Sequence, residues 1–193
     1  MNAPFDVTGV TLYTERLTLR PFCQSDLEDL FTYASVDGVG QMAGWPPHQT
    51  PEASQFILNL FIEEKKVFAI EYEGKVIGSL GVECYQESKH PEFADKKCRE
   101  LGFVLAKPYW GRGLMPEAVN RVIAYLFDEV GLDAIFCGHF RRNHQSARVQ
   151  EKCGFRFLSY GQFQTRMGTV EEEQMNLLTR EEYLRLREER KGV

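Results

Sequence analysis

The residues with the clearest chemical pattern lie in one short stretch, residues 108–118, which reads P-Y-W-G-R-G-L-M-P-E-A. An apolar segment of strand length, residues 101–106, precedes its G-x-G pair, and a long amphipathic run to Val130 follows. Glycine lets a ligand approach the backbone, and the first N–H groups of a helix lack partners inside it and carry partial positive charge. The stretch therefore predicts an anion cradle, although such turns also contain paired glycines for packing reasons.

Seven strands are expected around this stretch, from alternating or continuous apolar segments bounded by turn residues. They are residues 12–21, 67–72, 76–84, 100–106, 134–140, 155–160 and 172–178. Helices are expected at residues 25–34, 50–64, 115–130, 143–153 and 179–193. Thr50 and Asn143 are natural N-caps, Gly131 and Gly154 mark helix ends, and residues 85–99 are expected to form a charged surface loop.

The order of these elements predicts an α+β fold in one domain, residues 1–193, with residues 1–10 as an N-terminal tail. The β-α-β crossover through the long helix makes strands 100–106 and 134–140 a central parallel pair, and hairpins make the other pairs antiparallel. We therefore expect a seven-stranded, mixed, mostly antiparallel sheet with flanking helices. A ligand crevice should lie near the carboxyl ends of the parallel strands.

Composition narrows the class of protein. The formal net charge of −5 comes without a Lys/Arg stripe, which argues against nucleic-acid binding. No signal-peptide pattern and no apolar run of about 18 residues occurs, so a cytoplasmic protein without a membrane partner is expected. The five cysteines are scattered and never spaced C-x-x-C, which predicts free thiols and neither disulfides nor a metal site.

Three separated motifs resemble the GNAT superfamily of acetyl-coenzyme A-dependent N-acetyltransferases, in its RimJ/RimL-like branch. They are W-G-R-G-L-M-P-E-A at 110–118, N-H-Q-S-A-R-V-Q-E-K-C-G-F at 143–155 and T-E-R-L-T-L-R-P at 14–21. The resemblance covers nearly the whole chain in the right order. It implies a GNAT-like fold and identifies the anion as the pyrophosphate of acetyl-CoA.

The resemblance also implies a set of cofactor-binding residues. The family's pyrophosphate loop, Q/R-x-x-G-x-G/A, falls on Trp110, Gly111, Arg112, Gly113, Leu114 and Met115. Trp110 and Met115 depart from that pattern, but neither change removes a main-chain donor.

Two further groups complete this set. Val104 and Ala106, on the strand before the loop, match positions that offer main-chain groups to the pantetheine arm. Asn143 and Ser146 match positions that hydrogen-bond the arm or the phosphates, and Asn143 is equally expected as a helix cap.

The family's usual acid–base residues are absent. Gly138 stands where some relatives carry a Glu, and Gln150 stands where many carry a Tyr. Glu100 is the best remaining base, although a solvated strand-end carboxylate is an equal interpretation. His139 is a candidate substrate-site residue, with a hydrogen-bonded core histidine as the alternative.

The acceptor site is expected between residues 42–48 and residues 85–99. Trp45 is the candidate lining residue of this site. The alternative is that Trp45 simply packs its loop on the core.

The predicted function is direct transfer of an acetyl group from acetyl-CoA to a primary amine in a ternary complex. The acceptor is either a protein N-terminus or a small-molecule amine. The oligomeric state is either a monomer or a homodimer. A non-catalytic acyl-CoA-binding regulatory module is the alternative, because the usual Glu and Tyr are missing. A nucleotide-binding domain is disfavoured by the absence of a GK[ST] motif and a second Rossmann glycine.

Overall fold

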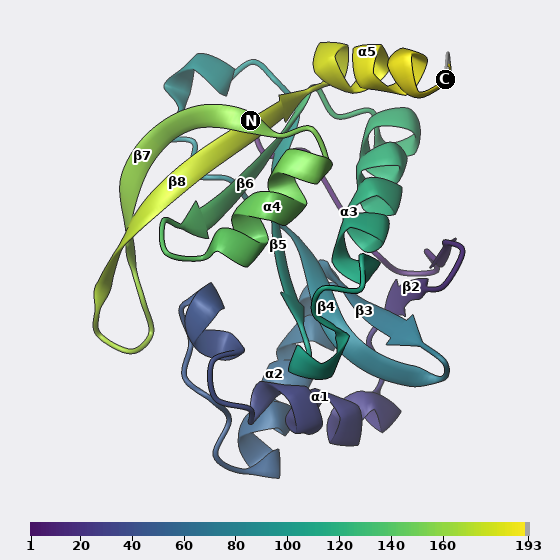
Figure 1. Ribbon diagram of the computed structural model, residues 1–193, viewed down its shortest axis with the longest axis vertical. Coiled ribbons are helices and arrows are strands. Elements are labelled where there is room, and N and C mark those ends of the chain that lie inside the picture. Colours follow the sequence, from purple (N-terminus) through teal and green to yellow (C-terminus); the bar gives the residue numbers. More distant parts are fainter. Residues whose placement is uncertain (192–193) are drawn as a thin grey trace.

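In a computed structural model that describes residues 1–191, one sheet has the strand order β1-β2-β3-β4-β5-β6-β8-β7 (Figure 1). Its strands are β1 (Leu12–Tyr13), β2 (Thr18–Pro21), β3 (Val67–Tyr72), β4 (Lys75–Glu83), β5 (Cys98–Leu105), β6 (Ala134–Phe140), β7 (Arg156–Gln164) and β8 (Val170–Thr179). The helices are α1 (Leu27–Ala34), α2 (Pro51–Glu64), α3 (Leu114–Tyr125), α4 (His144–Lys152) and α5 (Arg180–Lys191). Among the described residues, no helix combines the length and apolar character needed to span a membrane.

Among the named strands of the described residues, β5 and β6 form the one parallel pair, as expected from the crossover through α3. It lasts only from Cys98 opposite Ala134 to Glu100 opposite Phe136. Both strands continue beyond that point, β5 to Leu105 and β6 to Phe140, without pairing to each other. The sheet therefore opens between its two central strands just after Glu100.

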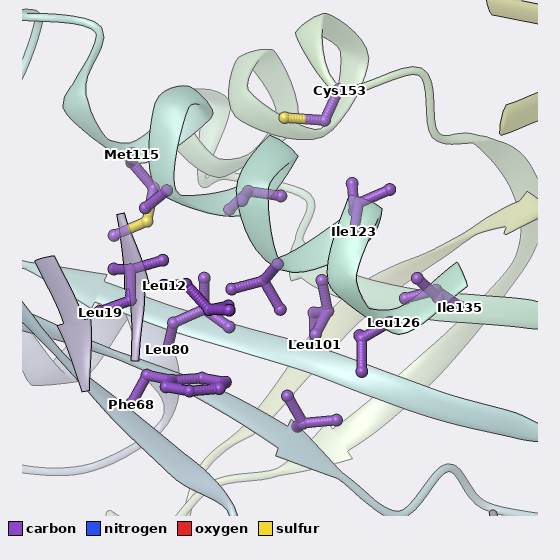
Figure 2. Close-up of a cluster of buried hydrophobic side chains, with 14 of the residues drawn as sticks. Leu12, Leu19, Phe68, Leu80, Leu101, Met115, Ile123, Leu126, Ile135 and Cys153 are labelled. Carbon is purple, nitrogen blue, oxygen red and sulfur yellow. The ribbon is translucent and has the colours of Figure 1, made fainter. Parts of the chain in front are cut away.

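The core lies on both faces of the sheet. On β3, Phe68 and Ile70 belong to the cluster formed with α3, whereas Val67 and Ala69 belong to the cluster formed with α1 and α2. Figure 2 shows the first cluster, with side chains of α3 above Phe68 and Leu80 of the sheet. Burial on both faces makes the sheet a rigid support for the turn that opens α3.

The first predicted strand, residues 12–21, is wrong in detail, because it forms two strands and raises the sheet from seven strands to eight. Leu12 pairs with Leu19 across a turn in which the Thr14 N–H donates to the Leu17 carbonyl at 3.0 Å. The Thr14 hydroxyl also donates to Glu117 at 2.6 Å. Contacts with α3 thus bend a segment whose alternation alone predicts a straight strand.

The predicted loop at residues 85–99 is also partly wrong. It contains a short 3₁₀ turn, Pro91–Phe93, and its last two residues belong to β5, which begins at Cys98. Residues 1–10 were expected to be a tail, but Ala3 and Val7 are buried, and the Ala3 N–H donates to the Cys98 carbonyl at 3.2 Å. The pairs of Cys98 with Ala134 and of Arg99 with Ile135 on β6 account for the earlier start of β5.

The local helix signals are confirmed. Thr50 accepts from the Ala53 N–H, Asn143 accepts from the Ser146 N–H, and Gly131 has the left-handed φ of 76° beyond a five-residue π-helical turn (Leu126–Val130) that continues α3. The C-terminal helix is α5, Arg180–Lys191, and the remainder of its predicted range, residues 192–193, lies outside the described residues.

Candidate active site

A cleft of about 360 Å³ opens where the end of β5, the turn before α3 and the first turns of α4 meet. In Figure 1, α4 lies beside α3 and over β6, next to this turn. Its lining includes many of the residues predicted to hold the cofactor: Val104, Gly111, Gly113, Leu114, Met115, Asn143 and Ser146. Segments far apart in the sequence thus converge on one surface.

The turn before α3 has the backbone geometry of an anion cradle. Gly111 and Gly113 have left-handed φ values of 73° and 76°. Within residues 1–191, no hydrogen bond is made by the main-chain N–H groups of residues 111–115. Since Pro116 has no N–H, every available donor of this turn and of the start of α3 is left for a ligand. These donors, with the helix dipole, suit a phosphate group.

Side chains around the turn hold it in place. The Arg16 guanidinium donates to the Arg112 carbonyl at 3.0 Å and pairs with Glu117 of α3 at 2.7 Å. The Trp110 indole N–H donates to the Leu105 carbonyl at 2.6 Å, which ties the turn to the end of β5. The tryptophan that departs from the family pattern thus has a structural role.

The Arg112 side chain lies over the rings of Tyr72 and Tyr109 and does not line the cleft, so only its main chain remains a candidate for cofactor contact. Met115, the second departure, turns its side chain into the core and is 5% exposed, although it also lines the cleft (Figure 2). Ala106 lies outside the cleft: its N–H donates to the Ile77 carbonyl at 2.8 Å and its side chain joins the α1–α2 core.

Asn143 and Ser146 are positioned by the start of α4. The Asn143 side-chain oxygen Oδ1 accepts from the Ser146 N–H at 3.1 Å, and its side-chain amide donates to the Met42 carbonyl at 3.3 Å. The Ser146 hydroxyl accepts from the Gln150 amide at 3.2 Å. Asn143 thus caps α4 and fixes the loop on the other side of the cleft.

Gln150, at the family's tyrosine position, is a structural residue. It is fully buried, donates to the Gly138 carbonyl at 3.1 Å and accepts from the Asn176 amide at 2.7 Å. A buried amide with these partners cannot protonate a leaving thiolate. Its hydrogen bonds instead link α4 to β6 and β8.

A second, smaller cleft of about 150 Å³ lies where β5 and β6 separate, and it contains Glu100 and His139. It shares lining residues with the larger cleft, so the two adjoin: Met42, Ala43, Phe103, Asn143 and Ser146. The predicted base and the predicted cradle are therefore brought together. Sequence spacing alone did not require this.

Glu100 has the electrostatics of a proton acceptor at neutral pH. Burial, followed by the nearby negative charge of Glu173, raises its pKa from 4.5 to about 7. Glu83, directly opposite on β4, adds a smaller effect in the same direction, and Lys89 opposes it. A carboxyl with such a pKa is available in both protonation states near pH 7, as a general base requires.

His139 is 8% exposed and lines the same smaller cleft. Its Nδ1 lies 3.0 Å from the Phe140 carbonyl oxygen, and its Nε2 is buried with no hydrogen-bond partner within residues 1–191. A carbonyl oxygen only accepts, so Nδ1 carries the proton of the neutral ring and Nε2 keeps its lone pair. The ring thus offers the cleft one acceptor.

Trp45 is placed elsewhere. Its indole packs over Gly40, where an added Cβ would lie 2.1 Å from the ring, and against the His48 ring at 5.2 Å. It lines neither cleft, and Met42 and Ala43 of the preceding turn do so instead. The geometry agrees with the loop-packing interpretation.

Sequence reasoning missed Glu173 of β8, which is 8% exposed and lines the smaller cleft. Its carboxylate lies over the bare backbone of Gly138, where an added Cβ would be 2.8 Å from Oε1. The run E-E-E at 171–173 gave no indication that the third member is buried. The one available clue was the glycine itself at the family's glutamate position.

The model of the acetyltransferase (GNAT) domain family matches residues 16–156. The chain belongs to this family. It is 27% identical over 151 residues to the uncharacterized N-acetyltransferase YoaA of Bacillus subtilis, covering 75% of this chain and 81% of YoaA.

Two solved structures have the same fold. A GNAT-family acetyltransferase from Bacillus anthracis matches with a TM-score of 0.77 and 24% identity, over 89% of this chain and 99% of that one. The microcin C7 self-immunity acetyltransferase MccE, solved with acetyl-CoA and AMP, matches with a TM-score of 0.71 and 16% identity, over 86% and 93%. The resemblance seen in the motifs is thus confirmed, and this GNAT protein is an N-acetyltransferase rather than a non-catalytic module.

Proposed function

We propose that this GNAT protein transfers an acetyl group from acetyl-CoA directly to a primary amine, with both substrates bound at once. The observation that carries the proposal is the run of unused N–H groups at residues 111–115, in a cleft that adjoins the one holding Glu100. Acetyl-CoA, when bound, supplies an activated thioester. The residues of the chain supply orientation and a proton acceptor.

The larger cleft would hold the cofactor through main-chain donors at its pyrophosphate. Gly113 and Leu114 line this cleft together with Asn143 and Ser146 of the α4 N-terminus. The smaller cleft would hold the amine, where Glu100 removes a proton so that the nitrogen lone pair becomes available. Holding the two reacting groups in adjoining clefts supplies much of the rate by proximity.

A covalent acetyl-cysteine route has little support. Cys137, the cysteine on β6, is buried, and burial raises the pKa of its thiol well above 9.0. A buried neutral thiol is a poor nucleophile. Direct transfer predicts intersecting initial-rate lines when acetyl-CoA and amine are varied, whereas parallel lines would contradict it.

Gly113→Val tests the cradle, and Gly9→Val is its matched control. Both glycines have left-handed φ values, 76° and 72°, so both variants carry similar backbone strain of about 1–2 kcal/mol. Of these two glycines, Gly113 lines the larger cleft and Gly9 does not. Titration calorimetry with CoA should show an affinity loss of roughly 10–100-fold for Gly113→Val, from disrupted hydrogen bonds to a charged phosphate, and none for Gly9→Val. Equal affinities in both variants would remove the basis for the cofactor site.

A further inference from the structure

Three consecutive glutamates on β8 have different surroundings. Glu171 pairs with Arg142 at 2.9 Å, and Glu172 pairs with Arg141 at 3.0 Å. Glu173 is 8% exposed, and its side chain makes no hydrogen bond or ion pair with any residue in the range 1–191. Its two neighbours are ordinary surface pairs, whereas the mostly buried Glu173 side chain has no protein partner and reaches the clefts that it lines.

Backbone positions without side chains make room for this carboxylate. On β6, a Cβ at Gly138 would lie 2.8 Å from Glu173 Oε1, and on β7 a Cβ at Gly161 would lie 3.9 Å from Oε2. The β6–β8–β7 pairing places both glycines beside β8, opposite Met175 and Glu173 respectively. Glu173 therefore occupies the volume that a side chain at Gly138 would fill.

Glu173 also connects two hollows. It lines the smaller cleft with Glu100 and His139, and it lines an outer hollow of about 350 Å³ with Lys89, His90 and Tyr160. The cofactor cleft adjoins the smaller cleft from the other side, through Phe103 and Ser146. An acceptor entering by the outer hollow would meet Glu173 before reaching the thioester.

An unpaired buried carboxylate is costly, because no partner replaces the water that it loses. Burial accordingly raises the pKa of Glu173, and Lys89 opposes this only in part. A second acid, Glu100, faces the same space, and the unpartnered His139 Nε2 adds an acceptor. Two carboxyl groups and an unpartnered ring nitrogen in one cleft are complementary to a group that brings several N–H donors and a positive charge.

We propose that Glu173 is a catalytic residue that binds the ammonium group of a primary amine acceptor, beside Glu100 and above Gly138. The carboxylate on β8 thus takes the place that a glutamate on β6 would fill. This assignment rests on the proposed function. It specifies an acceptor that arrives as a cation, either a small alkylamine or the unblocked N-terminus of a peptide.

The ammonium donates hydrogen bonds to Glu173 and Glu100, and Glu100 takes one proton from it. The nitrogen lone pair forms the C–N bond as the C–S bond of the thioester breaks. The departing sulfur takes the second proton from nitrogen, and Glu100 releases its proton to solvent, so that one proton is released per amide formed.

The test compares Glu173→Gln with Glu172→Gln, since these are adjacent glutamates on one strand and only the first faces the cleft. Loss of a charged hydrogen bond predicts a fall of roughly 10–100-fold in kcat/KM for the amine with Glu173→Gln. Thiol release is measured with n-butylamine and with an unblocked alanine peptide as two separate arms. The affinity for CoA should be unchanged in both variants.

Thermal unfolding without ligand distinguishes a catalytic from a structural role of Glu173. A structural role would lower the Tm of Glu173→Gln, whereas the proposed role predicts a higher Tm. Removing an unpaired buried charge should raise the Tm of Glu173→Gln above that of the native chain, while its turnover falls. Saturation with CoA followed by n-butylammonium chloride should raise the Tm of the native chain and not that of Glu173→Gln.

Each outcome has a clear meaning. A loss of turnover in the peptide arm alone, or in the butylamine arm alone, supports the assignment and identifies the source of the ammonium. A lower Tm in Glu173→Gln, or kcat/KM values equal to those of Glu172→Gln in both arms, overturns it. Failure of the native chain to bind CoA instead overturns the proposed function, so the two failures are distinguishable.

Discussion

Glu100→Gln is expected to stabilise the folded protein at alkaline pH while removing most of its activity. In the native chain the Glu100 carboxyl lies in the opening between β5 and β6, where burial and the charge of Glu173 raise its pKa to about 7. Glutamine has nearly the same shape and no charge to bury. The substitution therefore removes the electrostatic cost of burying the Glu100 charge while leaving the packing of the side chain nearly unchanged.

The size of the effect follows from the pKa. A carboxyl whose pKa is raised on folding binds more protons in the folded state, so its contribution to stability falls as pH rises from 4.5 to about 7 and is constant above that. The difference between these two pKa values corresponds to about 3 kcal/mol of destabilisation at pH 8. The stability gain of Glu100→Gln should grow from about 1 kcal/mol at pH 5 to about 3 kcal/mol at pH 8.

Urea unfolding of both proteins at pH 5, 6, 7 and 8 measures this gain directly. The other groups facing Glu100 (Glu83, Glu173, Lys89 and His139) are present in both proteins, so the difference between the curves isolates Glu100. In activity assays, kcat/KM of the native enzyme should fall below a pH of about 7, and Glu100→Gln should lower it by roughly 10²–10⁴.

A stability difference that stays constant between pH 5 and 8 would refute the raised pKa. Full activity of Glu100→Gln, with the same pH profile as the native enzyme, would refute its role as base. The two results are independent. A buried carboxylate without catalytic function would pass the first test and fail the second.

Two further substitutions test other parts of the site. Asn143→Ala should lose about 1 kcal/mol of stability in urea unfolding and weaken CoA binding in calorimetry, because the α4 cap and the Met42 contact both disappear. The control Thr50→Ala, which removes the cap of α2 outside both clefts, should lose similar stability with unchanged CoA affinity. Trp45→Ala should lose roughly 3 kcal/mol of stability by removing the indole that packs over Gly40. Its KM for the amine should not change; a large rise in that KM would restore Trp45 to the acceptor site.

Local features of this chain could be predicted because their causes lie within a few residues. The caps at Thr50 and Asn143 and the left-handed glycine at position 131 depend on hydrogen bonds and φ preferences inside one turn. The cradle is of the same kind, since its donors are consecutive N–H groups of a glycine turn. The order of elements also fixed which two strands run parallel.

Other features depended on strand pairing between distant segments. The turn that divides the first strand is tied to Glu117 of α3, and the structural role of Gln150 depends on Asn176 of β8. The loop around Trp45 predicts a place in the acceptor site, but tertiary packing sets its ring over Gly40 instead. No periodicity or spacing within these segments carries that information.

The sequence by itself determined the family, the glycine turn that opens the long helix and the absence of a glutamate at position 138. Only the tertiary structure decided that a carboxylate from another strand occupies the space beside that glycine. The antiparallel register of β6 with β8 brings Glu173 over Gly138, and the separation of β5 from β6 exposes Glu100 beside it. A carboxylate acquires its pKa and its partner from whatever the fold places around it, and those neighbours come from strands far apart in the chain.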